Sequence, residues 1–141
     1  MHCVFSTKER RPLITPELQT RLFPYLGGIA RENKMKLLSA GGIADHVHLL
    51  VSMPKTFGIG KATQLIKGGS SKWIHDTFPE HRLFEWQEGY GAFSIGIGER
   101  KRTITYIENQ PEHHKKRDFK QEFLLFLDRH EIEYSLNQVF D

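Results

Sequence analysis

The stretch Asp45-His46-Val47-His48-Leu49-Leu50-Val51 decides how the rest of the chain is interpreted. It is an apolar run between a glycine pair and Pro54, which is the pattern of a buried β-strand. Successive side chains on a strand point to opposite faces, so His46 and His48 leave from the same face. Two imidazoles on one face can bind one metal ion or one phosphate. The same spacing also suits one hydrogen-bonded interior histidine beside a partly exposed one, so the functional interpretation needs a third partner.

The composition indicates a folded domain without disulfides. The chain has 141 residues, of which 38% are hydrophobic and 26% charged, and we expect residues 1–141 to form one domain. No segment approaches the roughly 18 consecutive apolar residues of a membrane span, and the N-terminus lacks the basic region of a signal peptide. Cys3 is the only cysteine, which excludes an internal disulfide and a cysteine-rich zinc site. We therefore expect a cytoplasmic protein with no membrane partner.

The net charge of +3 permits a nucleic-acid partner without requiring one. Basic residues gather at four points of the chain: Lys8, Arg10 and Arg11; Lys67 and Lys72; Arg100, Lys101 and Arg102; and Lys115, Lys116 and Arg117. Acidic residues lie among them, so each cluster alone is typical of a solvated surface. Convergence of several clusters on one backbone would indicate nucleic-acid binding.

The segment before the histidine strand predicts a strand, a helix and a second strand. Residues 2–7 form a short apolar run, and Thr15-Pro16-Glu17 is a helix start with threonine as the cap and proline in the first turn. Helical spacing of apolar residues continues to about residue 33, with a kink or break expected at Pro24 and the following glycine pair. Residues 35–43 predict a strand that is bulged at Gly41-Gly42.

A second helix is expected from Lys61 to a point before Pro79, and a fourth strand within residues 84–97. The resulting order is the ferredoxin-like arrangement of an α+β protein, an antiparallel sheet with helices on one face. Such a sheet leaves its other face free for a ligand or a second subunit. Two further helices are expected, over residues 99–110, where Pro111 would stop the first, and over residues 118–130.

Tyr106 and Gln110 supply a possible partner for the histidines. They lie four residues apart in the helix expected over residues 99–110, so their side chains share one face. A tyrosine hydroxyl can act as a nucleophile, and a glutamine carbonyl can ligate a metal. Taken alone, the pair is more typical of a tyrosine packed at a helix edge and a solvated glutamine.

The pieces together resemble a known family, the single-tyrosine transposases of the HUH superfamily encoded by the smallest bacterial and archaeal insertion sequences, with their relatives linked to repetitive extragenic palindromes. The resemblance runs nearly end to end. Its motifs are Phe5-Ser6-Thr7-Lys8-Glu9-Arg10-Arg11-Pro12, Asp45-His46-Val47-His48-Leu49-Leu50-Val51, Leu65-Ile66-Lys67-Gly68-Gly69-Ser70-Ser71, Trp86-Gln87-Glu88-Gly89-Tyr90-Gly91-Ala92-Phe93-Ser94 and Tyr106-Ile107-Glu108-Asn109-Gln110.

The resemblance implies an enzyme that cleaves and rejoins single-stranded DNA. His46, His48 and Gln110 would hold a divalent ion, Mg²⁺ or Mn²⁺, and Tyr106 would be the nucleophile that forms a 5′-phosphotyrosine link. No obvious dedicated base for Tyr106 stands out in the sequence. The family also implies a homodimer in which active sites are shared between subunits.

The implied substrate is hairpin DNA, bound mainly through its phosphates. The candidate contacts are Lys8, Arg10, Arg11, Lys67 and Lys72. His113 and His114 can be taken as a second metal or phosphate site, although polar residues at a helix junction are the preferred interpretation.

Three other functions stay open at this point. A non-catalytic DNA- or RNA-binding module uses the same sheet topology, but it requires exposed aromatic residues on the sheet, for which residues 84–93 are the candidates. A water-using, metal-dependent phosphoesterase would leave Tyr106 with a structural role only. A domesticated endonuclease acting on host palindromes would share the chemistry of a transposase.

Overall fold

The computed structural model describes residues 1–56, 58–115 and 118–129 of the chain. The strands are β1 (His2–Ser6), β2 (Lys36–Ile43), β3 (His46–Ser52) and β4 (Gly91–Phe93). The helices are α1 (Pro16–Glu32), α2 (Ile59–Thr77), α3 (Arg100–Glu108), α4 (Gln110–His113) and α5 (Phe119–Arg129). None of the helices in these residues is long and apolar enough to cross a membrane.

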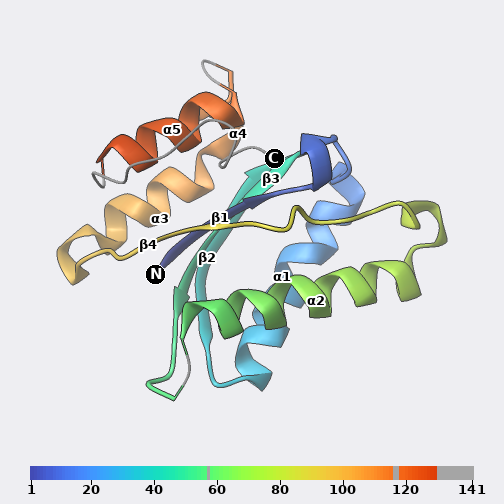
Figure 1. Ribbon diagram of the computed structural model, residues 1–141, viewed down its shortest axis with the longest axis horizontal. Coiled ribbons are helices and arrows are strands. Elements are labelled where there is room, and N and C mark those ends of the chain that lie inside the picture. The colour runs from blue at the N-terminus through green and yellow to red at the C-terminus, as the bar shows by residue number, and fades with distance from the viewer. Residues whose placement is uncertain (57, 116–117, 130–141) are drawn as a thin grey trace.

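The strands form one antiparallel sheet in the order β2-β3-β1-β4. β1 pairs with β3 along the whole length of β1, from His2 opposite Leu50 to Ser6 opposite His46. Helices α1 and α2 lie together on one side of the sheet, whereas α3, α4 and α5 lie on the other (Figure 1). This order of elements confirms the predicted ferredoxin-like α+β fold with additional C-terminal helices.

The hydrophobic core fills the space between the sheet and helices α1 and α2. Val47, Leu49 and Val51 of β3 point into it together with Phe5 of β1, and each is at most 1% exposed. Burial of a side chain of this size contributes roughly 1.5–3 kcal/mol relative to an exposed one. Because the strand alternates, the same residues that anchor this core direct His46 and His48 to the opposite face.

The expectation that this opposite face would be free for a ligand or second subunit is wrong for the described chain. Helices α3, α4 and α5 cover it, and His46 is 0% exposed. α3 approaches β2 so closely that a Cβ atom on Gly41 would lie 2.0 Å from the carbonyl oxygen of Ile107. Only glycine allows this contact, which seats the helix that carries Tyr106 against the sheet.

Two local expectations in the first half of the chain differ from the structure: there is no break in the helix at Pro24 and no bulge at Gly41-Gly42. α1 is continuous through Pro24, which lies on the exposed face of the helix, because the buried stripe that includes Leu22 and Leu26 holds both halves against the core. The irregularity of β2 lies between Leu37 and Ser39, not at Gly41-Gly42. The glycines instead serve the close approach of other backbone segments.

The C-terminal helices differ from the prediction in one boundary. α3 ends at Glu108, Asn109 adopts non-helical angles (φ −97°, ψ 21°), and α4 begins at Gln110 with Pro111 in its first turn. Pro111 therefore starts the next helix, where its missing N–H is not needed, and does not stop the preceding one. α5 agrees with the expected helix as far as Arg129, and the predicted last residue, His130, lies outside the described residues.

Candidate functional site

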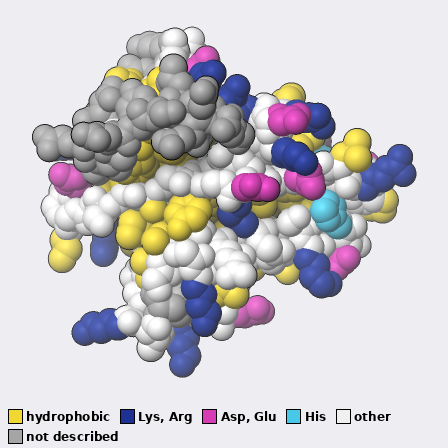
Figure 2. Space-filling model, viewed as in Figure 1, with side chains coloured by type: hydrophobic (Ala, Val, Ile, Leu, Met, Phe, Trp, Pro, Cys, Tyr) yellow, Lys and Arg dark blue, Asp and Glu magenta, His cyan; other side chains and the backbone are white. Residues whose placement is uncertain are grey.

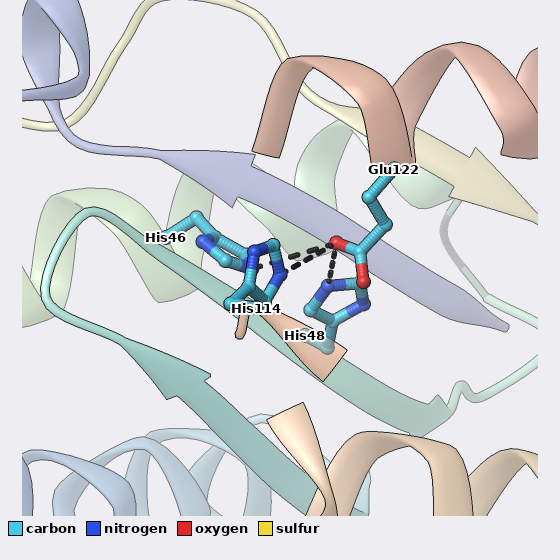
Figure 3. A group of neighbouring side chains, drawn as sticks. All are labelled: His46, His48, His114 and Glu122. Carbon is cyan, nitrogen blue, oxygen red and sulfur yellow. Dashed lines mark hydrogen bonds and ion pairs between the residues drawn. The ribbon is translucent and has the colours of Figure 1, made fainter. Parts of the chain in front are cut away.

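The site is built on β3, which places two buried imidazoles side by side. The ring centroids of His46 and His48 are 5.1 Å apart, and both side chains are fully buried. Glu122 of α5 and His114, which follows α4, reach the same point from above the sheet (Figure 3). The ligand atoms of these four side chains lie within 4.8 Å of one another. We call His46, His48, His114, Glu122 and the adjacent Gln110 the histidine cluster.

The orientation of the two strand histidines is set by hydrogen bonds at Nδ1. His46 Nδ1 is 2.8 Å from Asp45 Oδ1, and His48 Nδ1 is 2.8 Å from His2 Nε2. Each bond holds the ring so that Nε2 faces the centre of the cluster. In metal sites, a hydrogen bond at the ring nitrogen that does not bind the metal fixes the orientation and the tautomer of the histidine. His2 lies opposite Leu50 in the β1–β3 ladder, so the sheet itself supplies the partner of His48.

The Nε2 atoms meet an amide and a carboxylate. His46 Nε2 lies 3.0 Å from Gln110 Oε1 and 3.5 Å from Glu122 Oε1, while His48 Nε2 lies 2.7 Å from Glu122 Oε1. Gln110 and Glu122 are themselves buried, at 0% and 1% exposure. The structure therefore brings together the three side chains that the sequence suggested as metal ligands and adds a carboxylate to them.

His114 also joins the cluster. Its Nε2 atom is 3.0 Å from Gln110 Oε1 and 3.3 Å from Glu122 Oε1. The residue does lie at a helix end, as preferred from the sequence, but its side chain is only 4% exposed and is part of the main site. His113 points elsewhere and stacks on the ring of Tyr106, with centroids 4.4 Å apart. The two histidines thus do not form a second site of their own.

Tyr106 lies at the edge of the cluster. Its hydroxyl donates a hydrogen bond to Glu122 Oε2, and its ring centroid is 5.8 Å from that of His48. Gln110 Nε2 donates to the same carboxylate oxygen at 3.2 Å. Glu122 therefore holds Tyr106 and Gln110 with one oxygen and the histidines with the other. The acceptor for the tyrosine proton that the sequence did not reveal is available here.

The electrostatics of the cluster are those of a compensated buried ion pair. Burial opposes protonation of His46, but hydrogen bonds to Asp45 and Glu122 outweigh it and raise the pKa of His46 to about 9. Burial dominates at His48 and lowers its pKa to about 4. Burial alone would raise the pKa of the Glu122 carboxyl, yet hydrogen bonds from His114, His46 and His48 hold it well below its usual range. At neutral pH a protonated His46 thus faces an ionised Glu122.

The donor atoms have the spacing of a metal site. Donors around an ion with bond lengths of about 2.1 Å are about 3.0 Å apart in an octahedron. The observed separations run from 2.7 Å for His48 to Glu122, through 3.0 Å for His46 to Gln110, to 3.5 Å for His46 to Glu122. Imidazole nitrogens with one carboxylate form a donor set typical of divalent transition metals. The cluster can therefore hold one divalent ion once His46 releases its proton.

The five residues predicted to contact DNA are spread over two regions, and most are engaged within the protein. Lys8 pairs with Glu85 at 3.0 Å, Arg11 with Glu9 at 2.7 Å, and Lys72 with Asp76 at 3.0 Å. Figure 2 shows Lys and Arg side chains distributed around this view of the molecule, several of them beside acidic ones.

Lys67 and Arg10 differ from the other three. The half-buried ammonium group of Lys67 donates to the carbonyl oxygens of Gln87, Glu88 and Gly89, and burial lowers its pKa. Arg10 has a positive φ of 55° and lines a cavity of about 610 Å³ together with Lys8. Phe119, whose ring lies 4.8 Å from that of His46, also lines this cavity. The turn over residues 8–10 is therefore near the cluster, whereas Lys67 is hydrogen-bonded to the loop over residues 87–89.

Sequence reasoning missed His2 and Glu122, and it did not place His114 in the main site. The signal for Glu122 is its place on the apolar stripe of α5, since Phe119, Phe123 and Phe126 around it are all buried. An acid on such a stripe is expected to have a buried partner. His2 shares the alternation of β1 with Val4, and nothing local distinguishes it from a surface residue.

Comparison with known proteins gives a consistent result. A family model described as "Transposase IS200 like" matches residues 1–110. The transposase for insertion sequence element IS200 from Salmonella typhimurium is 28% identical over 120 residues, which cover 81% of this chain and 78% of that protein. The ISDra2 transposase TnpA from Deinococcus radiodurans is 25% identical over 114 residues, covering 77% and 81%.

Two solved structures share the fold. A crystal structure described as a candidate transposase from Deinococcus radiodurans has a TM-score of 0.62 and 26% identity, covering 77% of this chain and 88% of that one. A REP-associated tyrosine transposase bound to a REP hairpin has a TM-score of 0.60 and 16% identity, covering 80% and 66%. At the latter identity the likeness concerns the fold alone.

Proposed function

Because this chain belongs to the family of IS200-like transposases, we propose that it cleaves and rejoins single-stranded DNA through a covalent link to Tyr106. The observation that carries the proposal is the convergence of the Tyr106 hydroxyl, two strand histidines and Gln110 on one buried point. These residues come from three separate elements, so their meeting is a property of the fold and not of local sequence.

In the proposed reaction, the Tyr106 oxygen attacks the phosphorus of a phosphodiester. The new bond is a 5′-phosphotyrosine ester, and the 3′ oxygen leaves and takes up a proton. Glu122 orients the tyrosine hydroxyl through the hydrogen bond between them, accepts its proton and passes that proton to the leaving 3′ oxygen, so the carboxylate is ionised again at the end of the step. Attack by another 3′-hydroxyl reverses the step at a different junction. Since the ester bond energy is kept in the protein–DNA link, the cycle needs no nucleotide cofactor.

The metal is proposed to be a divalent ion, Mg²⁺ or Mn²⁺, held by His46, His48 and Gln110. The spacing of the donor atoms supports His114 and Glu122 as additional ligands. Such an ion supplies Lewis-acid stabilisation of the charge on the scissile phosphate and the leaving oxygen. Imidazole-rich sites favour Mn²⁺ over Mg²⁺, which prefers oxygen ligands and water. The donor set therefore supports Mn²⁺ as the better of the two ions.

The burial of the aromatic residues weighs against a non-catalytic binding module. That function requires exposed rings on the sheet, but Phe84, Trp86 and Phe93 are 1%, 9% and 2% exposed. Among the aromatic residues at positions 84–93, Tyr90 is the one that is substantially exposed, at 40%. A binding module would also leave the histidine cluster without a purpose.

Single-stranded DNA with hairpins is the proposed substrate. Lys8 and Arg10, which line the cavity beside Phe119, are the contacts nearest the cluster, and Arg11, Lys67 and Lys72 are further contacts. A cytoplasmic location follows from such a substrate. The solved relative bound to a REP hairpin supports hairpin recognition by analogy. Recognition through phosphates positions the strand without reading its sequence.

The proposed homodimer has active sites shared between subunits. Within a single chain, Tyr106 already lies beside its own His48, with ring centroids 5.8 Å apart. Sharing would therefore require α3 to leave its own sheet and dock on the partner's. Mixing Tyr106→Phe with His46→Ala protein tests this: recovered activity in the mixture supports shared sites, and an inactive mixture despite subunit exchange supports sites completed within one chain.

The main experiment mixes the protein with a pool of labelled single-stranded hairpins and Mn²⁺ or Mg²⁺, and then detects a protein–DNA adduct on a denaturing gel. We expect an adduct that needs metal and disappears in Tyr106→Phe. Metal-dependent cleavage without an adduct would instead support the water-using phosphoesterase. Hairpin binding with neither, after controls with double-stranded DNA and RNA, would support the binding module.

A further inference from the structure

A cavity of about 560 Å³ opens beside Tyr106. Its volume falls within the roughly 300–1,000 Å³ of typical ligand sites. Two of its lining residues also contact the histidine cluster: Tyr106 donates to Glu122, and His2 is hydrogen-bonded to His48. A strand of DNA that reaches the tyrosine can therefore enter through this cavity, whereas the interior of the cluster is fully buried.

Arg102 is the basic side chain in the lining of this cavity. It precedes Tyr106 by four residues on α3, so the two side chains lie on the same face of the helix with Cβ atoms about 6 Å apart. Arg102 is exposed, and in the described part of the chain no hydrogen bond or ion pair engages its guanidinium group.

This freedom distinguishes Arg102 from several other basic residues. Lys8, Lys72 and Lys115 each pair with an acidic side chain, at 3.0, 3.0 and 3.1 Å. A cation that is already paired must release its partner before it binds a phosphate, whereas an unpaired arginine binds without that cost. Arginine also matches the geometry of two phosphate oxygens at once.

We propose that Arg102 binds the scissile phosphate itself and holds it against the Tyr106 hydroxyl. The inference rests on the proposed function, since it names a substrate-binding residue for that reaction. The guanidinium donates to the two non-bridging oxygens and remains protonated throughout, while the proton of Tyr106 passes to Glu122. It neutralises charge on the phosphate from the open side of the tyrosine, where the histidine cluster does not reach.

A second charged residue of the cavity supports this placement. Glu99 precedes Arg102 by three residues and also lines the cavity. Its carboxylate repels a phosphate, so the negative group is favoured near Arg102 and Tyr106 and disfavoured at the Glu99 end. A phosphate beside Arg102 and Tyr106 would thus meet both a cation and the nucleophile.

The first test compares Arg102→Gln with Lys101→Gln, using the hairpin from the pool that reacts fastest with the unaltered protein. Lys101 is exposed on the same helix, carries the same charge and is not among the residues lining this cavity. Arg102→Gln is expected to slow adduct formation by about 100-fold, and Lys101→Gln by less than about 3-fold. Arg102→Lys should recover part of the rate, because it restores the charge without the two-oxygen contact.

The second test replaces the scissile phosphate by a methylphosphonate, which carries no negative charge. If Arg102 neutralises that charge, the ratio of rates between the unaltered protein and Arg102→Gln should fall from about 100 to near 1 on this substrate. A methylphosphonate one nucleotide away should leave the ratio near 100. These paired substrates separate contact with the scissile phosphate from general attraction of DNA.

The outcomes distinguish the two proposals. Equal rates for Arg102→Gln and Lys101→Gln, or an unchanged ratio on the methylphosphonate, would overturn the role of Arg102 while leaving Tyr106 chemistry intact. Absence of any Tyr106-dependent adduct in the unaltered protein would overturn the proposed function, and the inference with it. Thermal unfolding of each variant identifies a loss of rate that comes from misfolding, and in that case Arg102→Lys carries the comparison.

Discussion

The two faces of the central strands are equally buried but chemically opposite. On β3, His48 is 0% exposed on one face and Leu49 is 0% exposed on the other. Leu49 contacts an apolar core under α1 and α2, whereas His48 is hydrogen-bonded to His2 and Glu122. Burial alone therefore does not distinguish the structural face from the candidate site, but the need for polar partners does.

This difference has an energetic consequence. Apolar burial stabilises the fold in proportion to its area, whereas buried charged and polar groups lose hydration that their partners only partly replace. Most of the stability should come from the core face. The cluster face contributes little net stability, and its buried groups are instead arranged for binding and chemistry.

The largest effect is expected from a substitution on the core face of β3. Leu49→Ala should lower the free energy of unfolding by about 2–5 kcal/mol, because it removes a fully buried side chain and leaves a cavity. Urea unfolding measures the change. Leu125→Ala, at a leucine that is 37% exposed, is the matched control and should cost much less. Similar losses at both positions would contradict the assignment of stability to this face.

The next effect concerns the protonation of the cluster face in metal-free protein. The pKa of His46 is raised to about 9, so the folded protein keeps a proton that the unfolded chain releases above about pH 6.5. The free energy of unfolding should therefore fall as pH rises from about 6.5 to about 9, by on the order of 3 kcal/mol.

Urea unfolding with a chelator at pH 6.5 and pH 9 measures this loss, and His46→Gln should remove most of it. His48 does not interfere, because its pKa is lowered to about 4 and its effect appears only as pH falls below about 6.5. A free energy of unfolding that rises between pH 6.5 and pH 9 would show that His46 is not charged in the folded state.

A smaller effect is expected from the residue that orients His48. The ring centroids of His2 and Phe126 are 5.1 Å apart. His2→Phe keeps an aromatic ring at this position but removes the hydrogen bond to His48 Nδ1. Metal affinity should fall by about 10–100-fold, as for other second partners of metal-binding histidines. Titration calorimetry with Mn²⁺ measures the change, and His75→Phe, whose histidine bonds to the carbonyl of Phe84, is the control.

The smallest effect concerns the charged surface over α2. Lys72→Ala should leave the free energy of unfolding almost unchanged, because the pair with Asp76 is exposed to solvent. If Lys72 contacts a DNA phosphate, as the sequence suggested, the variant should also bind the hairpin with a weaker salt dependence. The slope of the logarithm of the binding constant against the logarithm of the salt concentration should fall in magnitude by about one. Binding with an unchanged slope would exclude Lys72 as a phosphate contact.

Local patterns were sufficient to predict most of the fold. Strand alternation placed both histidines on one face, helical spacing located α1, α2 and α5, and the order of elements predicted the ferredoxin-like sheet, which the structure confirms. Local signals failed where packing outweighs them. Pro24 does not break α1, because the buried stripe holds the helix on the core, and Gly41 marks a contact with α3, not a bulge.

The sequence by itself determined the pairs of residues that share an element, such as His46 with His48. Their spacing follows from the period of a strand and needs no knowledge of distant contacts. The additional partners were decided only by tertiary structure. Glu122 is 74 residues from His48, and His2 is 46 residues from it, yet each lies within hydrogen-bonding distance. The packing of α5 over the sheet and the pairing of β1 with β3 create these contacts, and no local periodicity encodes either.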